Sequence, residues 1–162
     1  MALEYRYRTV DFRPAPDGWR TAWITRDGLA VMPMPGWLVQ EEVEDDDQHT
    51  DDGRPTGHRN VVAGRIEDNG IEPIDYTTDR EFWLILGPGE AEPTSDEVAI
   101  ETSRRYSDGR LKGLLSAVPC PTCAEDSHYV SKLDRYIHLD GSENSSCWLA
   151  ISRGATRTGE SS

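Results

Sequence analysis

Turn-forming residues divide the first 75 residues of the chain into short segments. Proline and glycine at 14–18 break an extended segment, and the pairs Asp27-Gly28 and Asn69-Gly70 favour tight hairpin turns because these residues tolerate positive φ angles. The segments between the turns are rich in aromatic and β-branched side chains, which favour strands. The predicted strands cover residues 4–12, 19–25, 29–32, 37–43, 60–67 and 71–74. The pattern predicts an antiparallel β meander of five to six strands, forming a sheet or a small barrel.

The pattern changes after residue 75, where two capping boxes occur. Thr78 is followed three residues later by Glu81, and Thr94 is followed in the same way by Glu97. Each box predicts the start of a helix, and Gly-Pro-Gly at 87–89 would end the first one. Three helices are predicted. The first covers residues 82–86, the second runs from the capping box at Thr94 to about residue 106, and the third covers residues 110–118. Together with the strands, they predict an α+β fold with two to three short helices.

Charge is distributed unevenly along the chain. The net charge is −13, and residues 1–109 carry all of it, because residues 110–162 hold six basic and six acidic side chains. Between Glu41 and Asp52 there are eight carboxylates and no Lys or Arg, so this stretch is expected to repel itself and remain solvated. The predicted organisation is an acidic β-rich domain at 1–117 with a mobile acidic loop at 44–58, a small module at 118–152 and a disordered tail at 153–162.

The sequence also bears on cellular location. The N-terminus has no apolar segment of the secretory type, and the longest strongly apolar run, residues 82–86, is far shorter than the roughly 20 residues that cross a bilayer. The chain has three cysteines, and because an odd number cannot all pair, a framework of disulfide bonds is not expected. A cytoplasmic protein with no membrane partner is expected.

The chemistry that stands out is a cluster of potential metal ligands after residue 118. Cys120 and Cys123 form a Cys-x2-Cys turn, a spacing that lets two thiolates face one ion. A predicted hairpin of strands 135–139 and 147–151 would place Cys147 opposite His138. The predicted zinc ligands are therefore Cys120, Cys123, His138 and Cys147, with His128 as the substitute if His138 faces away.

The segment at about 118–152 resembles a zinc ribbon or zinc knuckle through this Cys-x2-Cys, His and Cys pattern. The resemblance implies a structural zinc ion, although the second half lacks the usual paired ligands. Two other interpretations remain open. The cysteines could be reduced and packed as small apolar side chains, with Cys147 beside Trp148. Alternatively, Cys120 and Cys123 could form a redox pair.

Three classes of function fit these features. The first is a non-enzymatic interaction or accessory protein that binds a protein partner with a basic surface. The second is a protein related to nucleic acids, in one of two forms: the C-terminal tail contacts a nucleic-acid strand, or the acidic half mimics DNA. Direct binding of nucleic acid to the acidic N-terminal domain is not expected, because phosphate binding needs clustered Lys and Arg. The tail residues in question are Arg135, Tyr136, Trp148, Arg153 and Arg157. The third is a thiol- or metal-dependent enzyme, for which the sequence offers no second catalytic group.

Overall fold

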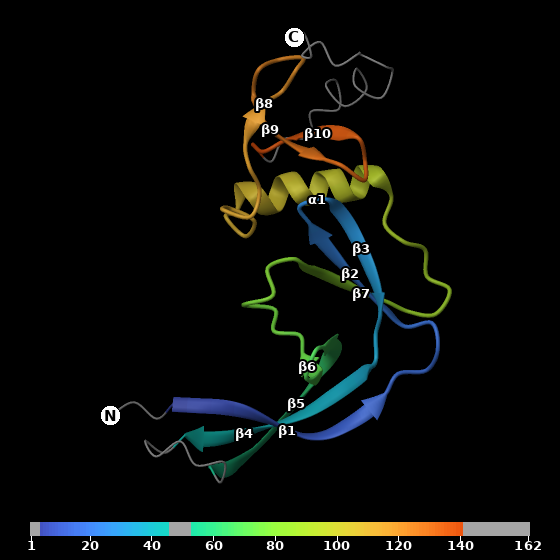
Figure 1. Ribbon diagram of the computed structural model, residues 1–162. Helices are drawn as coiled ribbons and strands as arrows, with labels where there is room; N and C mark the ends of the chain where they lie inside the picture. Colours follow the sequence, from blue (N-terminus) through green and yellow to red (C-terminus); the bar gives the residue numbers. More distant parts are fainter. Residues whose placement is uncertain (1–3, 46–52, 141–162) are drawn as a thin grey trace. The chain divides into compact units, whose positions relative to one another are not determined.

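The computed structural model describes residues 4–45 and 53–140 of the 162-residue chain (Figure 1). Within these residues the chain forms ten strands and one helix. In order, they are β1 (Glu4–Pro14), β2 (Arg20–Thr25), β3 (Gly28–Pro33), β4 (Gly36–Asp45), β5 (Arg54–Glu67), β6 (Gly70–Pro73), β7 (Phe82–Leu86), α1 (Ser95–Ser107), β8 (Val118–Pro119), β9 (Asp126–Val130) and β10 (Arg135–His138). In the part of the chain so described, no helix is long and apolar enough to cross a membrane.

The strands form three sheets, with the orders β1-β4-β5-β6, β3-β2-β7 and β10-β9-β8. Contacts divide the described residues into two compact units. Of these residues, unit 1 holds 4–21, 32–45, 53–79 and 87–89, and unit 2 holds 22–31, 80–86 and 90–140. The predicted β-rich character of the N-terminal part is confirmed, but the strands do not form one continuous meander. The chain leaves the first sheet after β1, makes the hairpin of β2 and β3 in another sheet, and returns at β4.

The predicted α+β class with two to three helices is wrong, since the described residues are mostly strand and contain one helix. Residues 82–86 form β7, because five apolar residues ending at Gly-Pro-Gly are too few for a stable helix and suit a short buried strand. The Thr78 box is not used as a cap. The backbone N–H groups of Thr78 and Asp79 donate instead to the carbonyl of Asp75, closing a turn before β7.

The predicted helix at 110–118 is also absent from the described residues. Gly109 and Gly113 adopt φ angles of 88° and 87°, which a right-handed helix cannot contain. Their turns lead to Leu111 and Leu115, which are both buried against other parts of unit 2. The predicted strand at 147–151 and the predicted tail at 153–162 lie outside the described residues. Of the predicted acidic loop at 44–58, the same is true of residues 46–52.

The sheet of unit 1 is held together by direct cross-strand pairs. Phe12 of β1 lies opposite Leu38 of β4, which lies opposite Val62 of β5. Trp19 and Trp37 meet edge to face with ring centroids 5.6 Å apart. β1 and β4 pair one to one from Glu4 to Thr9 before a bulge shifts the register. Because side chains alternate along a strand, this regular stretch assigns each residue to one of two faces.

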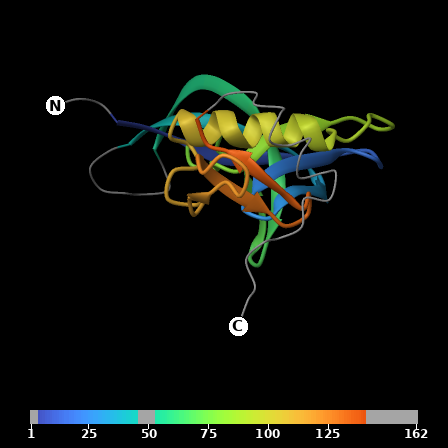
Figure 2. The same cartoon turned by 90° about the horizontal axis from the view of Figure 1, so that it is seen from above.

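In unit 2, α1 lies beside β9 and β10, as Figures 1 and 2 both show. The second capping box is confirmed: the Thr94 hydroxyl accepts a bond from the Glu97 N–H, and the Glu97 carboxylate accepts one from the Thr94 N–H. The helix buries Val98 and Ala99 in two separate apolar clusters. The first holds Ile24, Leu111, Leu115 and Leu139 around Val98, and the second holds Cys120, Val130 and Ile137 around Ala99. α1 thus anchors the sheet that carries the candidate metal ligands.

Candidate metal centre

A tight turn joins β8 to β9 and contains both cysteines of the Cys-x2-Cys motif. The N–H of Cys120 donates to the carbonyl of Glu125 at 2.8 Å, and the N–H of Ala124 donates to the carbonyl of Cys120 at 2.8 Å. Ala124 adopts a φ angle of 64°, in the left-handed region that glycine favours. The turn therefore closes on itself directly after Cys123, as a knuckle with both thiols within one short loop.

The register of the β10-β9-β8 sheet brings His138 to this knuckle. On β9, Ser127 lies opposite Val118 of β8 on one side and opposite His138 of β10 on the other. The Ser127 hydroxyl also donates to the carbonyl of Val118 at 2.8 Å. Since Val118 is two residues before Cys120, the end of β10 lies next to the start of the knuckle. The turn between β8 and β9 thus supplies both cysteines, and the end of β10 supplies the histidine, within one small sheet.

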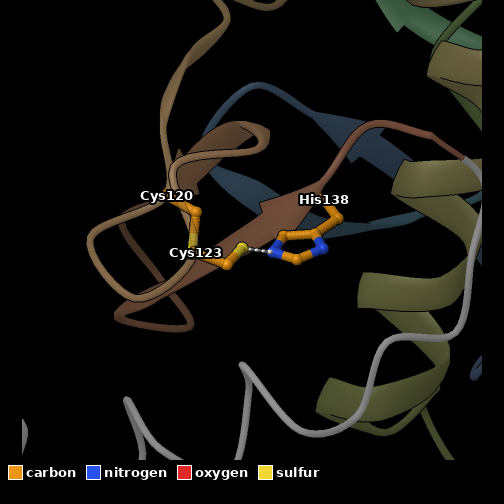
Figure 3. Close-up of side chains that lie close together, drawn as sticks. All are labelled: Cys120, Cys123 and His138. Carbon is orange, nitrogen blue, oxygen red and sulfur yellow. Dashed lines mark hydrogen bonds between the residues drawn. The ribbon is translucent and has the colours of Figure 1, made fainter.

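The three donor groups converge (Figure 3). The Sγ atom of Cys123 lies 3.3 Å from Nε2 of His138, and the ligand atoms of Cys120, Cys123 and His138 all lie within 4.8 Å of one another. A tetrahedral zinc site with ordinary Zn–S and Zn–N bonds places its donor atoms about 3.4–3.8 Å apart. The group is therefore close to a metal-binding arrangement, and a movement of about 1 Å would bring the three donor atoms to these separations.

Two of the three donors are shielded from solvent. Cys120 is 2% exposed and His138 is 1% exposed, whereas Cys123 is exposed. Burial raises the pKa of the Cys120 thiol, but hydrogen bonds from the Thr122 backbone, the His138 side chain and Cys123 outweigh it and lower that pKa from 9.0 to about 7. Amides that face the sulfur favour the thiolate, which is the form that binds metals.

His138 has a second nitrogen whose surroundings matter for metal binding. Its Nδ1 atom is buried and has no hydrogen-bond partner among residues 4–45 and 53–140. Nε2 faces Cys123, so Nε2 is the nitrogen that a metal ion would bind. Metal-binding histidines usually donate their other N–H to an acceptor, which fixes the ring orientation. The described residues supply the ligand nitrogen but not this supporting acceptor.

The remaining predicted ligands are placed differently. His128 has Nε2 2.7 Å from the carbonyl oxygen of Arg26 and Nδ1 3.4 Å from that of Ser116. Ser127 of β9 is the residue paired with His138, and His128 is the next residue along β9. Because successive side chains alternate, the side chain of His128 lies on the opposite face of β9 from that of Ser127. The structure therefore does not bring His128 to the donor group. Cys147 lies outside the described residues.

Sequence reasoning identified these three donors but missed the strand that positions them. It paired the segment at 135–139 with residues 147–151, whereas β10 pairs with β9. The pattern Asp-Ser-His-Tyr-Val at 126–130 gives a weak strand signal, since only Tyr129 and Val130 have high strand propensity. A cavity of about 210 Å³ next to the knuckle was also missed; it is lined by Tyr106, Glu125, Asp126, Leu139 and Asp140.

Comparison of the chain with protein-family models, curated proteins and solved structures finds no match. The likeness to a zinc knuckle therefore depends on the Cys-x2-Cys turn and His138 alone.

Proposed function

We propose that this chain is a non-enzymatic binding protein in which a structural zinc ion, held by Cys120, Cys123, His138 and Cys147, stabilises unit 2. The convergence of the first three donor atoms within 4.8 Å carries the metal part of the proposal. Two thiolates and an imidazole form a donor set that suits zinc. Cys147 is proposed as the fourth ligand because it is the remaining cysteine of three.

A structural role suits this geometry better than a redox role. The thiol with the lowered pKa, Cys120, is 2% exposed and packs in the cluster with Ala99, Val130 and Ile137. A thiolate that attacks another molecule needs access to solvent, which Cys120 lacks. A metal ion at this position would tie the knuckle to β10 and so to the sheet beside α1.

A protein partner fits the described residues better than a nucleic-acid strand. Arg135 donates to Asp96 at 2.7 Å, and Tyr136 packs on Tyr129 with ring centroids 5.1 Å apart. A nucleic-acid strand would need both of these side chains, and both already form contacts inside unit 2. The net charge of −13 opposes association with phosphates and favours encounter with a basic surface.

Metal analysis of the purified full chain tests the zinc site. One zinc per chain is expected, and Cys123→Ser, His138→Gln and Cys147→Ser should each weaken its retention against a chelator. Thr122→Ala is the matched control, because it changes a side chain inside the knuckle while keeping the backbone N–H that faces Cys120. Cobalt substitution adds a second readout, since tetrahedral cobalt with three thiolates absorbs more strongly in its sulfur charge-transfer bands than cobalt with two.

Two results would contradict this proposal. One is the absence of stoichiometric zinc in protein prepared without chelators. The other is a native disulfide between Cys120 and Cys123. With zinc present, chelation should increase hydrogen exchange in residues 118–140 more than in β1, β4 and β5, because the binding free energy of the ion adds to the stability of the unit that holds it.

A further inference from the structure

The alternating Tyr-Arg-Tyr-Arg sequence at 5–8 gives the two faces of β1 different chemistry. Successive side chains on a strand point to opposite faces, so Tyr5 and Tyr7 share one face and Arg6 and Arg8 share the other. On the neighbouring strand β4, the register places Glu44 opposite Tyr5, Glu42 opposite Tyr7 and Glu41 opposite Arg8. The acidic residues of β4 are therefore divided between a tyrosine face and an arginine face.

On the arginine face, the carboxylate is neutralised within the sheet. Glu41 accepts a hydrogen bond from Arg8 at 3.2 Å, and Arg59 of β5 lies 3.7 Å from the same carboxylate. Two guanidinium groups thus flank one carboxylate, which leaves this face with no excess negative charge.

On the tyrosine face, the carboxylate of Glu42 is held by hydroxyl groups. Tyr7 donates to its Oε1 at 3.2 Å and Thr56 donates to its Oε2 at 2.8 Å. Among the residues that the structure describes, no Arg or Lys lies within ion-pair distance of Glu42. The negative charge of Glu42, followed by the hydrogen bond, raises the pKa of Tyr7 above 10.0. Glu42 therefore offers a fixed negative charge, while Arg54, opposite Glu44, offsets part of the charge beside it.

The tyrosine rings on this face are open to solvent. Tyr5 is 53% exposed and Tyr7 is 50% exposed. Exposed aromatic side chains that lie together on a regular sheet are typical of a binding surface. An aromatic ring face next to a carboxylate suits a guanidinium group, which stacks on the ring and pairs with the carboxylate at the same time. An ammonium group stacks less well and forms no forked hydrogen bonds.

We propose that the surface formed by Tyr5, Tyr7 and Glu42, the Tyr–Glu face, binds an extended, arginine-containing segment of a partner protein. Two further features support this occupant. Among residues 4–45 and 53–140, β1 has β4 as its one hydrogen-bonded neighbour in the sheet, so an extended segment can lie along it (Figure 1). The sequence from 41 to 52 contains eight carboxylates and no Lys or Arg, which favours encounter with a cationic chain. The inference deepens the proposed binding function and does not depend on the zinc site.

The test uses the full chain and a short labelled peptide in which arginine alternates with serine, with fluorescence anisotropy as the readout. The same peptide with lysine in place of arginine should bind several-fold more weakly, and added salt should weaken both. Tyr5→Ala and Tyr7→Ala should each lower the affinity for the arginine peptide by roughly two- to fivefold, the size expected for one exposed cation–π contact. Glu42→Gln, which keeps the acceptor for Tyr7 but removes the charge, should lower it by a similar factor.

Two variants serve as controls. Tyr76 is 53% exposed, as Tyr5 is, and belongs to the same unit, so Tyr76→Ala should leave the affinity unchanged. Tyr7→Phe keeps the ring and should retain most of the binding, which separates loss of stacking from loss of the hydroxyl. Far-ultraviolet circular dichroism of each variant checks that the sheet is intact.

The outcomes separate this inference from the proposed function. If the arginine peptide binds in a salt-dependent way but the Tyr5, Tyr7 and Glu42 variants match Tyr76→Ala, the chain binds basic partners elsewhere and the Tyr–Glu face is refuted. If the lysine peptide binds as tightly as the arginine peptide, the stacking argument is refuted. If neither peptide binds at low salt, both the face and the proposed basic partner are refuted.

Discussion

Two arginines on α1 contact the same carboxylate and differ in burial, which allows a direct measurement of what burial adds. Arg104 and Arg105 each place a nitrogen 2.6 Å from Oε1 of Glu101. The Arg104 side chain is 57% exposed, whereas that of Arg105 is 2% exposed. We predict that Arg105→Met destabilises unit 2 strongly and that Arg104→Met barely changes its stability.

The expected magnitude follows from the contacts of Arg105. Besides its bond to Glu101, its Nη1 donates to the carbonyls of Phe82 at 2.7 Å and Arg80 at 3.2 Å. Methionine fills much of the same space but removes the guanidinium donors from these two carbonyls and from the Glu101 carboxylate, which keeps only the more exposed Arg104 as its ion-pair partner. Removing one partner of a buried ion pair costs about 3–5 kcal/mol, and an exposed pair contributes about 0–1 kcal/mol. The two variants should therefore differ by about 3 kcal/mol in the free energy of unfolding.

Urea unfolding followed by circular dichroism at fixed zinc concentration measures this difference. If Arg105→Met is too unstable to purify, Arg105→Lys keeps the charge and should fall between the two methionine variants. Burial raises the pKa of Glu101, but the hydrogen bonds and charges of the two arginines together outweigh it and lower that pKa below 4.5. The stabilisation by this carboxylate is therefore present above pH 4.5 and is lost as the pH falls through the lowered pKa. Equal costs for Arg104→Met and Arg105→Met at neutral pH would refute the reasoning.

Two smaller perturbations test local geometry. Thr94→Ala should lower the stability of α1 by about 1 kcal/mol, because it removes the side-chain half of the capping box. Hydrogen bonds from Thr94 lower the pKa of Glu97 below 4.5, so an NMR titration should show the carboxylate half of the cap at full strength above that pH and weakened as the pH falls through the lowered pKa. Ala124→Gly should stabilise the chain by about 1 kcal/mol in thermal unfolding, since the φ angle of 64° costs alanine about that amount and glycine little. A loss of stability in Ala124→Gly would contradict the assigned turn geometry.

The strands of the first 75 residues were predictable because their signals are local. Gly28 and Gly70 adopt φ angles of 119° and 129°, as the turn residues at those positions require, and β2, β3, β5 and β6 form hairpins around them. The pairing of strands that are distant in sequence was not predictable in the same way. Turn residues determine which consecutive strands pair, but they do not determine that β7 pairs with β2 or that β4 pairs with β1. Those pairings depend on long-range burial.

The two capping boxes show the limit of a local motif. Thr78 and Thr94 each precede Glu by three residues, yet only Thr94 starts a helix. The segment after Thr94 continues for 13 residues and buries Val98 and Ala99 in two clusters. The segment after Thr78 offers five apolar residues before a glycine, which is too short to offset the cost of starting a helix. Whether a capping box starts a helix therefore depends on the length of the segment that follows it and on the apolar side chains that this segment can bury.

The candidate metal centre was predictable as far as the chemistry of its donor groups determines it. Cys-x2-Cys spacing indicated a knuckle, and Cys120, Cys123 and His138 do converge. The strand pairing that places His138 next to the cysteines was not predictable, because β9 contains few residues with high strand propensity. His128 has the same donor chemistry as His138, and only the register of β9 and β10 separates them.

That register links the candidate metal centre to the apolar core of unit 2. Ile137 is 1% exposed and packs with Val130 and Ala99, while the next residue, His138, faces Cys123. A slip of one residue would exchange them, placing an imidazole in the apolar cluster and an isoleucine beside the sulfurs. Burial of Ile137 and the proposed metal binding by His138 therefore favour the same pairing. Because burial of one such side chain contributes about 1.5–3 kcal/mol, the core selects this register without any ion, and an ion bound as proposed would stabilise a site that the sheet has already aligned.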